Sequence, residues 1–161
     1  MELDTSDLPA TKSSKREMRT GRMARTRILL ATDSPWVVED VSSELESDEY
    51  EMEVVDSGRE AVRSVIEGKV GVLLVDMQIG SMGAPAVVAE VRNELDDKVA
   101  STPILCLLDR PADSWICKKM GADEAIVKPF EPGSLERAVR RLIRRKANSP
   151  AAASITAPRT S

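Results

Sequence analysis

Residues 69–80 have the sequence KVGVLLVDMQIG, and this stretch decides the fold class. An apolar run from Val70 to Val75, interrupted by one glycine, leads directly into the carboxylate of Asp76. Such a run is typical of a β-strand that is buried on both faces and has its charged residue at the carboxyl end. In an open parallel α/β sheet, ligands bind at that edge. Asp76 is therefore a candidate nucleophile or metal ligand, although the run alone also fits a polar strand end.

Four more apolar segments have the length of strands, and helical apolar spacing separates them. The further strands are expected at Arg27 to Ala31, Glu51 to Val55, Ile104 to Leu108 and Ala125 to Val127. The helices are expected around Val37 to Leu45, Gly58 to Ile66, Val87 to Leu95, Trp115 to Met120 and Pro132 to Lys146. The spacing places Ile66 and Leu95 on buried helix faces. Five strands that alternate with five helices predict an α/β fold with a doubly wound parallel sheet.

The composition limits the classes of function. The 161 residues are 42% hydrophobic and 31% charged, which predicts one soluble domain with polar ends. A net charge of -4 disfavours a dedicated nucleic-acid binder. No apolar run approaches the ~20 residues that cross a bilayer, and the start lacks a secretory pattern, so we expect a cytoplasmic protein. The absence of histidine excludes histidine-based acid–base catalysis and a phosphohistidine relay within this chain.

Three regions of the chain differ in composition. Residues 1–25 are polar and basic, and we expect them to form a disordered leader. Residues 26–146 have the periodicity of a folded domain, whereas residues 147–161 are rich in Ala, Ser, Pro and Thr and are expected to be a disordered tail. Cys106 and Cys117 lie in the folded region without a metal-ligand spacing, which favours buried, reduced thiols.

Charged residues follow or end three of the expected strands. Asp33 lies after the first, Asp76 ends the central one, and Lys128 follows the last. If the three edges face one crevice, two carboxylates and an ammonium group converge there. Oxygen ligands suit Mg²⁺, and a lysine can neutralise an anionic phosphoryl group. The pattern predicts an aspartate that can form an acyl phosphate beside a metal; three unrelated surface charges are the alternative.

Residues 26–146 resemble the receiver domain of response regulators in two-component signalling. The resemblance rests on ILLATDSP, DSGREAV, VGVLLVDMQIGSMG, TPILCLL, GADEAIVKPF and the closing amphipathic helix. It implies a flavodoxin-like sheet of order 2-1-3-4-5. It also implies that Asp76 is the phosphoacceptor and that Lys128 holds a phosphoryl oxygen. By the same resemblance, Mg²⁺ is bound by Asp33, Asp76 and the backbone carbonyl group of Gln78.

Several positions depart from the family pattern. Thr32 stands where the family usually has a second acid, so weaker Mg²⁺ binding is expected. Leu108 replaces the Ser or Thr that hydrogen-bonds the phosphoryl group, and Asp109 follows it, where a carboxylate can crowd or repel that group. Ala125 replaces the aromatic residue that swings inward on activation. Both halves of the usual switch are therefore absent from the sequence.

The departures, together with the lack of a recognisable output motif after residue 146, lead us to expect an atypical, stand-alone response regulator. Asp76 is expected to take a phosphoryl group from a sensor histidine kinase or phosphotransfer protein, and the phosphoprotein then acts through contacts with a downstream protein. It is not expected to be an enzyme, apart from catalysing its own phosphoryl transfer and dephosphorylation. The alternative is a pseudo-receiver that binds partners without phosphorylation. Retention of Asp76 and Lys128 favours the phosphoaccepting receiver. The alternative is favoured by the departures at Thr32, Leu108, Asp109 and Ala125.

The last helix carries an outward basic face. Its members are Arg137, Arg140, Arg141, Arg144 and Arg145. This face can pair with an acidic partner or with a second copy of the chain in a homodimer, and a solvated basic face fits the pattern equally well. Neither a membrane nor nucleic acid is an expected partner.

Overall fold

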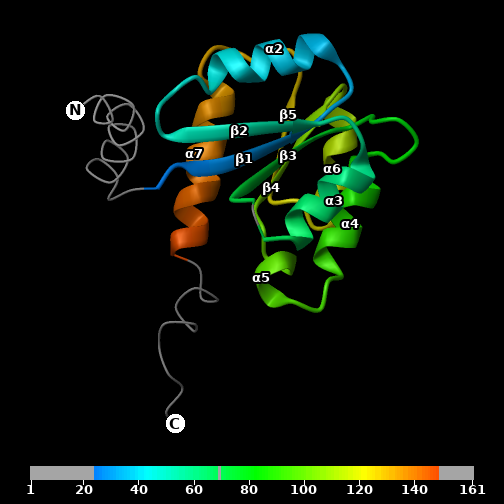
Figure 1. Cartoon of the computed structure of the whole chain (residues 1–161). Helices are drawn as coiled ribbons and strands as arrows, with labels where there is room; N and C mark the ends of the chain where they lie inside the picture. Colours follow the sequence, from blue (N-terminus) through cyan, green and yellow to red (C-terminus); the bar gives the residue numbers. More distant parts are fainter. Residues whose placement is uncertain (1–23, 69, 149–161) are drawn as a thin grey trace, which may run out of the picture.

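The computed structural model describes residues 24–68 and 70–148 (Figure 1). In this part of the chain, five strands form one parallel sheet in the order β2-β1-β3-β4-β5. The strands are β1 (Thr26–Ala31), β2 (Tyr50–Val55), β3 (Val72–Asp76), β4 (Ile104–Leu108) and β5 (Glu124–Val127). The parallel sheet and its strand order are confirmed, whereas nearly all of the predicted leader and tail lies outside the described residues.

The described residues form six α-helices, one more than the sequence predicted. These are α2 (Pro35–Glu44), α3 (Gly58–Ile66), α4 (Ala84–Arg92), α5 (Asp97–Ala100), α6 (Ser114–Met120) and α7 (Ser134–Ala147). A 3-10 helix, η1 (Pro111–Asp113), precedes α6. The extra helix, α5, is a single turn, too short for an apolar period to reveal. None of the described helices combines the length and apolar character that a membrane span requires.

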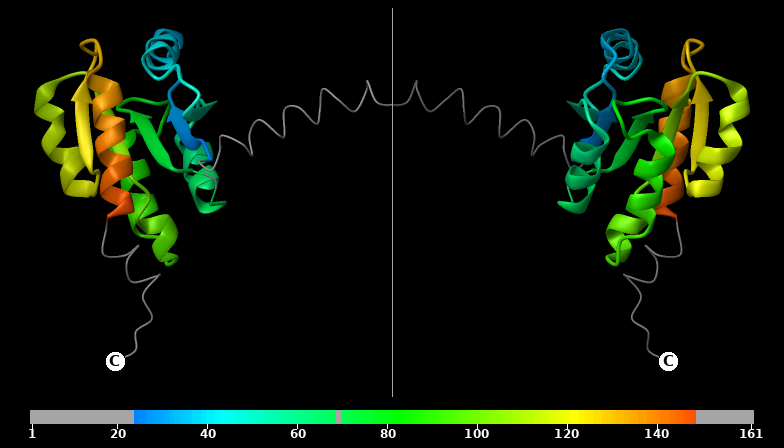
Figure 2. Two further views of the ribbon diagram at one scale, coloured as in Figure 1. Left: turned by 90° about the vertical axis from the view of Figure 1, so that its left-hand side faces the viewer. Right: turned by 90° about the vertical axis from the view of Figure 1, so that its right-hand side faces the viewer.

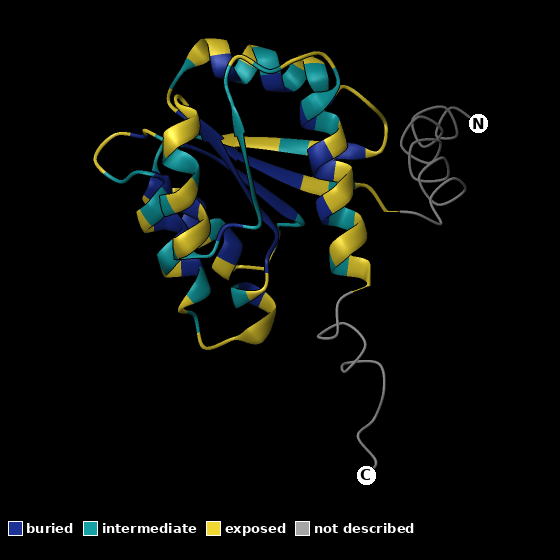
Figure 3. Cartoon of the chain, turned by 180° about the vertical axis from the view of Figure 1, so that it is seen from behind, coloured by how far each residue is buried: buried dark blue, intermediate teal, exposed yellow. Residues whose placement is uncertain are grey.

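Helices cover both faces of the sheet. Figure 1 shows α3, α4 and α6 on one side, and α2 and α7 on the other, and each set closes its own hydrophobic layer. Both views of Figure 2 show β5 between α6 and α7. β3 and β4 are buried along their whole length, as the dark blue strands at the centre of Figure 3 show. Double coverage explains why these two strands are almost continuously apolar.

Local sequence sets several helix ends. The side chain of Ser57 accepts a hydrogen bond of 3.1 Å from the N–H of Glu60 and so caps α3. Pro35 is the first residue of α2, a position whose N–H has no partner within the helix, so proline loses no helical hydrogen bond there. α6 ends at Met120 and is followed by the capping residue Gly121, whose φ of 121° lies in the range that favours glycine.

Two apolar residues that were predicted to face the core are exposed. Ile66, the last residue of α3, is 45% exposed, and Leu95 is 96% exposed. α4 ends at Arg92, so Leu95 lies beyond the helix. The four-residue spacing from Val91 to Leu95 continues the helical pattern after the backbone has left the helix.

Arg92 joins the ends of several elements. Its guanidinium group donates hydrogen bonds of 2.7–2.9 Å to the carbonyl groups of Gly121, Ala100 and Thr102 and to the carboxylate of Asp123. Asp123 also accepts the N–H of Ile104, the first residue of β4, at 2.8 Å. The aspartate of the GAD segment therefore has a structural role before β5, which the sequence did not reveal.

Cys106 on β4 and Cys117 on α6 are buried in the layer between the sheet and α6, and both carry free thiols, as predicted. The Sγ atom of Cys117 lies 3.7 Å from Sδ of Met77. A hydrogen bond with Cys117, together with burial, raises the pKa of the Cys106 thiol. Cys106 therefore stays protonated at neutral pH and belongs to the core.

Candidate functional site

Asp76 is the last residue of β3 and lies at the centre of the sheet, between β1 and β4. The residue is 2% exposed. A buried carboxylate is strongly disfavoured unless hydrogen bonds and charges replace its water. The residues that follow β1 and β5 supply these partners.

Thr32, directly after β1, is the neutral partner of Asp76. Its hydroxyl group donates a hydrogen bond of 2.6 Å to Oδ2 of Asp76, and Thr32 is itself buried. The N–H of Ser34 donates to Oγ1 of Thr32 at 3.1 Å, which fixes the hydroxyl group from the other side. In the sequence, Thr32 was notable only because it replaces the usual acid. In the structure, its hydroxyl group holds the Asp76 carboxylate in place.

Lys128, directly after β5, is the charged partner of Asp76. Its ammonium group forms a hydrogen-bonded ion pair with Oδ1 of Asp76 and lies 3.2 Å from Oδ1 of Asp109. The ring of Trp36, on α2, is centred 5.7 Å from the same nitrogen, within range of a cation–π interaction. The peptide bond between Lys128 and Pro129 is cis. Two carboxylates and an indole ring thus surround one buried cation.

Asp33 lies at the same edge of the sheet with a different partner. Its Oδ2 atom accepts the N–H of Gly80, in the loop after β3, at 3.0 Å. Gly80 has a φ of 52°, which turns this loop back toward Asp33. Of the three charged residues predicted to converge, Asp76 and Lys128 are in direct contact, whereas Asp33 binds the loop that follows Asp76.

The groups at this edge of the sheet offer the oxygen ligands that Mg²⁺ prefers. Asp33 is exposed and uses one carboxylate oxygen for Gly80, and the backbone of Gln78 belongs to the same exposed loop. Both oxygens of Asp76 already accept hydrogen bonds, but a carboxylate oxygen has a second lone pair for a metal. Within the described residues, no group of three or more acidic, cysteine or histidine side chains is assembled for a metal. The donor set fits an ion that keeps several waters, as Mg²⁺ does.

Three residues that depart from the usual pattern, Leu108, Asp109 and Ala125, lie in or next to β4 and β5. Leu108, the last residue of β4, is fully buried in the layer under α3, α4 and α6, and its side chain offers no hydrogen-bond donor. Asp109 is half exposed and turns toward Lys128. Ala125 on β5 packs against the same layer as Leu108. The sequence indicated that Asp109 can crowd or repel a phosphoryl group, and the structure shows its carboxylate paired with Lys128.

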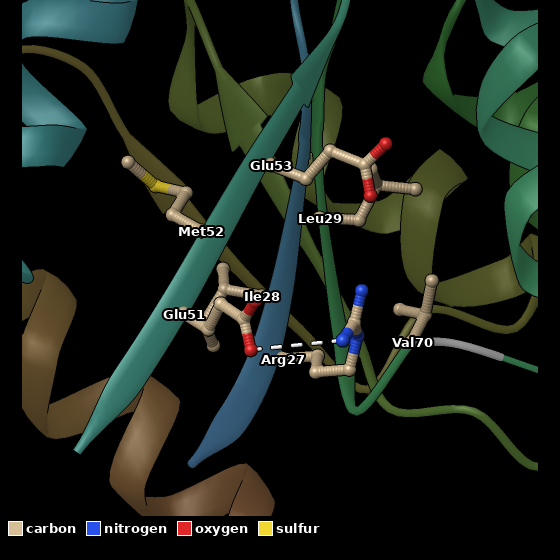
Figure 4. A pocket seen from close by; sticks show the side chains of 7 residues that line it. All are labelled: Arg27, Ile28, Leu29, Glu51, Met52, Glu53 and Val70. Atoms are coloured by element: carbon tan, nitrogen blue, oxygen red, sulfur yellow. Dashed lines mark ion pairs between the residues drawn. The ribbon is translucent and has the colours of Figure 1, made fainter. Parts of the chain in front are cut away.

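A cavity of about 300 Å³ opens elsewhere on the sheet (Figure 4). Its lining residues are Arg27, Ile28, Leu29, Glu51, Met52, Glu53 and Val70. An ion pair of 3.6 Å between Arg27 and Glu51 crosses it. These residues lie toward the amino-terminal ends of β1 and β2, whereas Asp76 and Lys128 lie at the carboxyl edge. The cavity is therefore separate from the Asp76 site.

The exposed arginines of α7 find acidic partners within the chain. Arg140 contacts Glu49 at 2.7 Å, and Arg141 and Arg145 both reach Glu124, at 2.8 and 3.0 Å. The hydrogen bond from Arg141 holds the pKa of Glu124 below its usual value. The predicted basic face is thus partly neutralised by its own neighbours.

Comparison with known proteins identifies the family. Residues 28–140 match the family model of the response regulator receiver domain. The DNA-binding response regulator MtrA of Mycolicibacterium smegmatis is 28% identical over 129 residues, which make up 79% of this chain and 54% of MtrA. The chain spans about half the length of the curated relatives that it matches.

Solved structures share the fold. The receiver domain of the sensor histidine kinase PA1611 from Pseudomonas aeruginosa, crystallised with a magnesium ion in its active site cleft, is 26% identical with a TM-score of 0.67; the match covers 75% of this chain and 99% of that one. The chemotaxis response regulator CheY4 of Vibrio cholerae is 29% identical with a TM-score of 0.66, over 74% of this chain and 99% of that one.

Proposed function

The chain belongs to the response regulator receiver domain family, and we propose that it signals by accepting a phosphoryl group on Asp76. The observation that carries the proposal is the contact between the buried Asp76 carboxylate and the Lys128 ammonium group, at the carboxyl edge of the sheet. A carboxylate can act as a nucleophile toward phosphorus, and an adjacent cation offsets the negative charge of the transferring group. Receiver domains are signalling domains, and the proposal assigns this chain no catalysis beyond the transfer reaction itself.

In the proposed reaction, an oxygen of Asp76 attacks the phosphorus atom of a phosphohistidine on the donor protein. The O–P bond forms as the P–N bond breaks, and the electron pair of that bond returns to the imidazole nitrogen. Neutral imidazole leaves when its second nitrogen carries a proton. Lys128 offsets the charge on the phosphoryl oxygens, and the hydrogen bond from Thr32 fixes the orientation of the carboxylate.

Magnesium fits this proposal. Asp33, Asp76 and the backbone carbonyl group of Gln78 would hold the ion, which supplies further neutralisation of phosphoryl charge. Because Thr32 brings a neutral hydroxyl group in place of an acid, the site has one negative charge fewer than the usual family pattern. We propose that Mg²⁺ binds here with lowered affinity.

The proposed partners follow from the family. The phosphoryl donor is a histidine kinase or a phosphotransfer protein, in the cytoplasm, and the output is a contact with a downstream protein or with a second copy of the chain. MtrA is described as DNA-binding, but the net charge of -4 and the internal pairing of Arg140, Arg141 and Arg145 do not favour nucleic acid for this chain.

A second function is favoured by Leu108, which ends β4, and Asp109, which follows it. Leu108 provides no donor for a phosphoryl oxygen, and Asp109 already contacts Lys128. A pseudo-receiver that binds its partners without phosphorylation would have the same fold and would leave Asp76 unmodified.

Intact mass spectrometry separates the two functions. The chain is incubated with Mg²⁺ and phosphoramidate, a small phosphoryl donor, and we expect its mass to rise by one phosphoryl group. The gain should be lost in Asp76→Asn and kept in Asp56→Asn, a matched change of an exposed aspartate directly after β2. A wild-type mass that stays constant at saturating donor and Mg²⁺ would support the pseudo-receiver.

A further inference from the structure

Asp109 is the first residue after β4, and its carboxylate lies 3.2 Å from the Lys128 ammonium group. The two side chains differ in exposure, since that of Asp109 is 52% exposed and that of Lys128 is 5% exposed. The neighbouring Arg110 forms its own ion pair, with Asp113 at 2.8 Å. Asp109 is thus the solvent-exposed partner of a buried cation.

We propose that Asp109 is a gating residue for phosphoryl transfer: in the unphosphorylated protein it occupies the side of Lys128 that a phosphoryl group must reach. The inference rests on the proposed function of Asp76. Asp109 acts through Lys128 and is a positioning residue, since the reacting atoms belong to Asp76 and the donor.

The geometry around Lys128 explains the competition. An ammonium group has three N–H donors; one binds Asp76, Asp109 lies within reach of a second, and the ring of Trp36 covers part of the remaining surface. A phosphoryl group that approaches Asp76 carries negative charge, so it must displace the Asp109 carboxylate or lie beside it. Both events disfavour transfer, the first through the lost ion pair and the second through like-charge repulsion.

We expect Asp109 to slow phosphoryl transfer without preventing it. Asp109 is half exposed, so water can solvate its carboxylate when it moves away from Lys128. Solvation then compensates for much of the stabilisation lost with the ion pair. An ion pair of this kind corresponds to a rate difference of about two- to fivefold. The gate also makes the rate sensitive to ionic strength, because salt weakens an exposed ion pair.

The competing role for Asp109 is that of a metal ligand that replaces the acid missing at position 32. The arrangement argues against it. Asp109 is drawn to Lys128, whereas the other proposed Mg²⁺ carboxylate, Asp33, is held by Gly80 in the loop after β3. The two roles predict opposite results when the charge of Asp109 is removed.

The test compares initial rates of phosphorylation by phosphoramidate, read by intact mass, in the full chain. Asp109→Asn keeps the side-chain size and removes the charge, and we expect a rate about two- to fivefold higher with no loss of Mg²⁺ affinity. Asp113→Asn, which removes a charge paired with Arg110, should leave the rate unchanged. An unchanged or lower rate in Asp109→Asn, or a weaker Mg²⁺ affinity, would overturn the inference while leaving phosphorylation of Asp76 intact.

A second measurement on unphosphorylated protein follows Lys128 itself. The ¹Hε–¹³Cε resonance of Lys128 should shift in Asp109→Asn and stay in place in Asp113→Asn; an unmoved resonance in Asp109→Asn would contradict the pairing. If no variant takes up a phosphoryl group, the proposed function fails and the gate fails with it.

Discussion

The hydroxyl group of Thr32 donates a 2.6 Å hydrogen bond to Oδ2 of Asp76, and both residues are buried. Hydrogen bonds to an ionised acceptor are stronger than those between neutral groups. The contact therefore holds the carboxylate in one orientation while lowering the negative charge of the site relative to the family pattern. The receiver fold is kept, and the electrostatic balance around Asp76 is changed.

Removing this hydrogen bond should destabilise the fold. Thr32→Val keeps the side-chain shape and leaves a buried carboxylate oxygen without its donor, so we expect the free energy of unfolding to fall by about 1–3 kcal/mol. Urea denaturation measures the change. The matched control is Thr102→Val, because that buried hydroxyl group donates to the neutral carbonyl of Val99 at 2.8 Å. A loss in Thr32→Val no larger than that in Thr102→Val would count against the charge-assisted bond.

Restoring an acid at position 32 should strengthen metal binding. Thr32→Asp places a further carboxylate against Asp76, and we expect the Mg²⁺ affinity to rise about tenfold while the metal-free protein becomes less stable. Fluorescence of Trp36, whose ring lies beside Lys128, reports the titration. An Mg²⁺ affinity equal to that of the wild type would show that the ion binds away from Asp76.

The pair of Asp76 and Lys128 should show strong energetic coupling. Lys128→Met leaves the buried carboxylate without its cation, and we expect a loss of about 3–5 kcal/mol in the free energy of unfolding. Adding Asp76→Asn should restore a large part of that loss, because the uncompensated charge is gone. Lys119→Met, which changes an exposed lysine beside Trp115, should alter stability by less than about 1 kcal/mol. Additive effects of the two substitutions in the double variant would refute the coupling.

Glu124 should make stability depend on pH. Its carboxylate accepts hydrogen bonds from Arg141 and Arg145, chiefly Arg141, which hold its pKa below the usual 4.5. A lowered pKa in the folded state stabilises the protein above the unfolded pKa, and this contribution disappears as the pH falls through the folded value. We expect Glu124→Gln to be about 1 kcal/mol less stable than the wild type at neutral pH.

Thermal unfolding across a pH series checks this expectation. Once the pH falls below the lowered pKa of Glu124 in the folded protein, the wild type and Glu124→Gln should converge, because protonated glutamate and glutamine are both neutral. A difference that persists unchanged into acid would mean that Glu124 acts through packing and not through its charge.

Arg92 should contribute more to stability than an exposed helix arginine. Its hydrogen bonds to the carbonyl groups and to Asp123 lie in a partly buried position. Arg92→Ala leaves several of these acceptors without a donor, and we expect a loss of about 3 kcal/mol. Arg63→Ala, on the exposed face of α3, is the control and should change stability by less than about 0.5 kcal/mol. Equal losses in the two variants would refute the role given to Arg92.

The sheet was predictable because short apolar runs alternate along the chain with segments of helical apolar spacing. Buried strands covered on both faces must be apolar, so β3 and β4 stand out as short hydrophobic runs, and alternation with helices leads to a parallel sheet. The errors lie where the apolar spacing and the helix do not coincide. Leu95 continues the spacing of α4 beyond Arg92, and the single turn of α5 is too short to have a period.

The site was predictable only in part. Parallel strands end at one edge, and this rule brought Asp76 and Lys128 together. It does not fix where side chains point beyond the strands, because loop conformation decides that. Asp33 is turned toward Gly80, whose φ is 52°, and Asp109 is turned toward Lys128. Those directions depend on tertiary packing, which periodicity does not contain.

The most direct test of the account is chemical trapping of the phosphorylated residue. The chain is incubated with phosphoramidate and Mg²⁺, reduced with borohydride, which converts an aspartyl phosphate to homoserine, and mapped by peptide sequencing in a mass spectrometer. The account predicts homoserine at position 76 and unmodified aspartate at Asp33 and Asp109. An intact Asp76 after saturating treatment, or homoserine at another position, would contradict it.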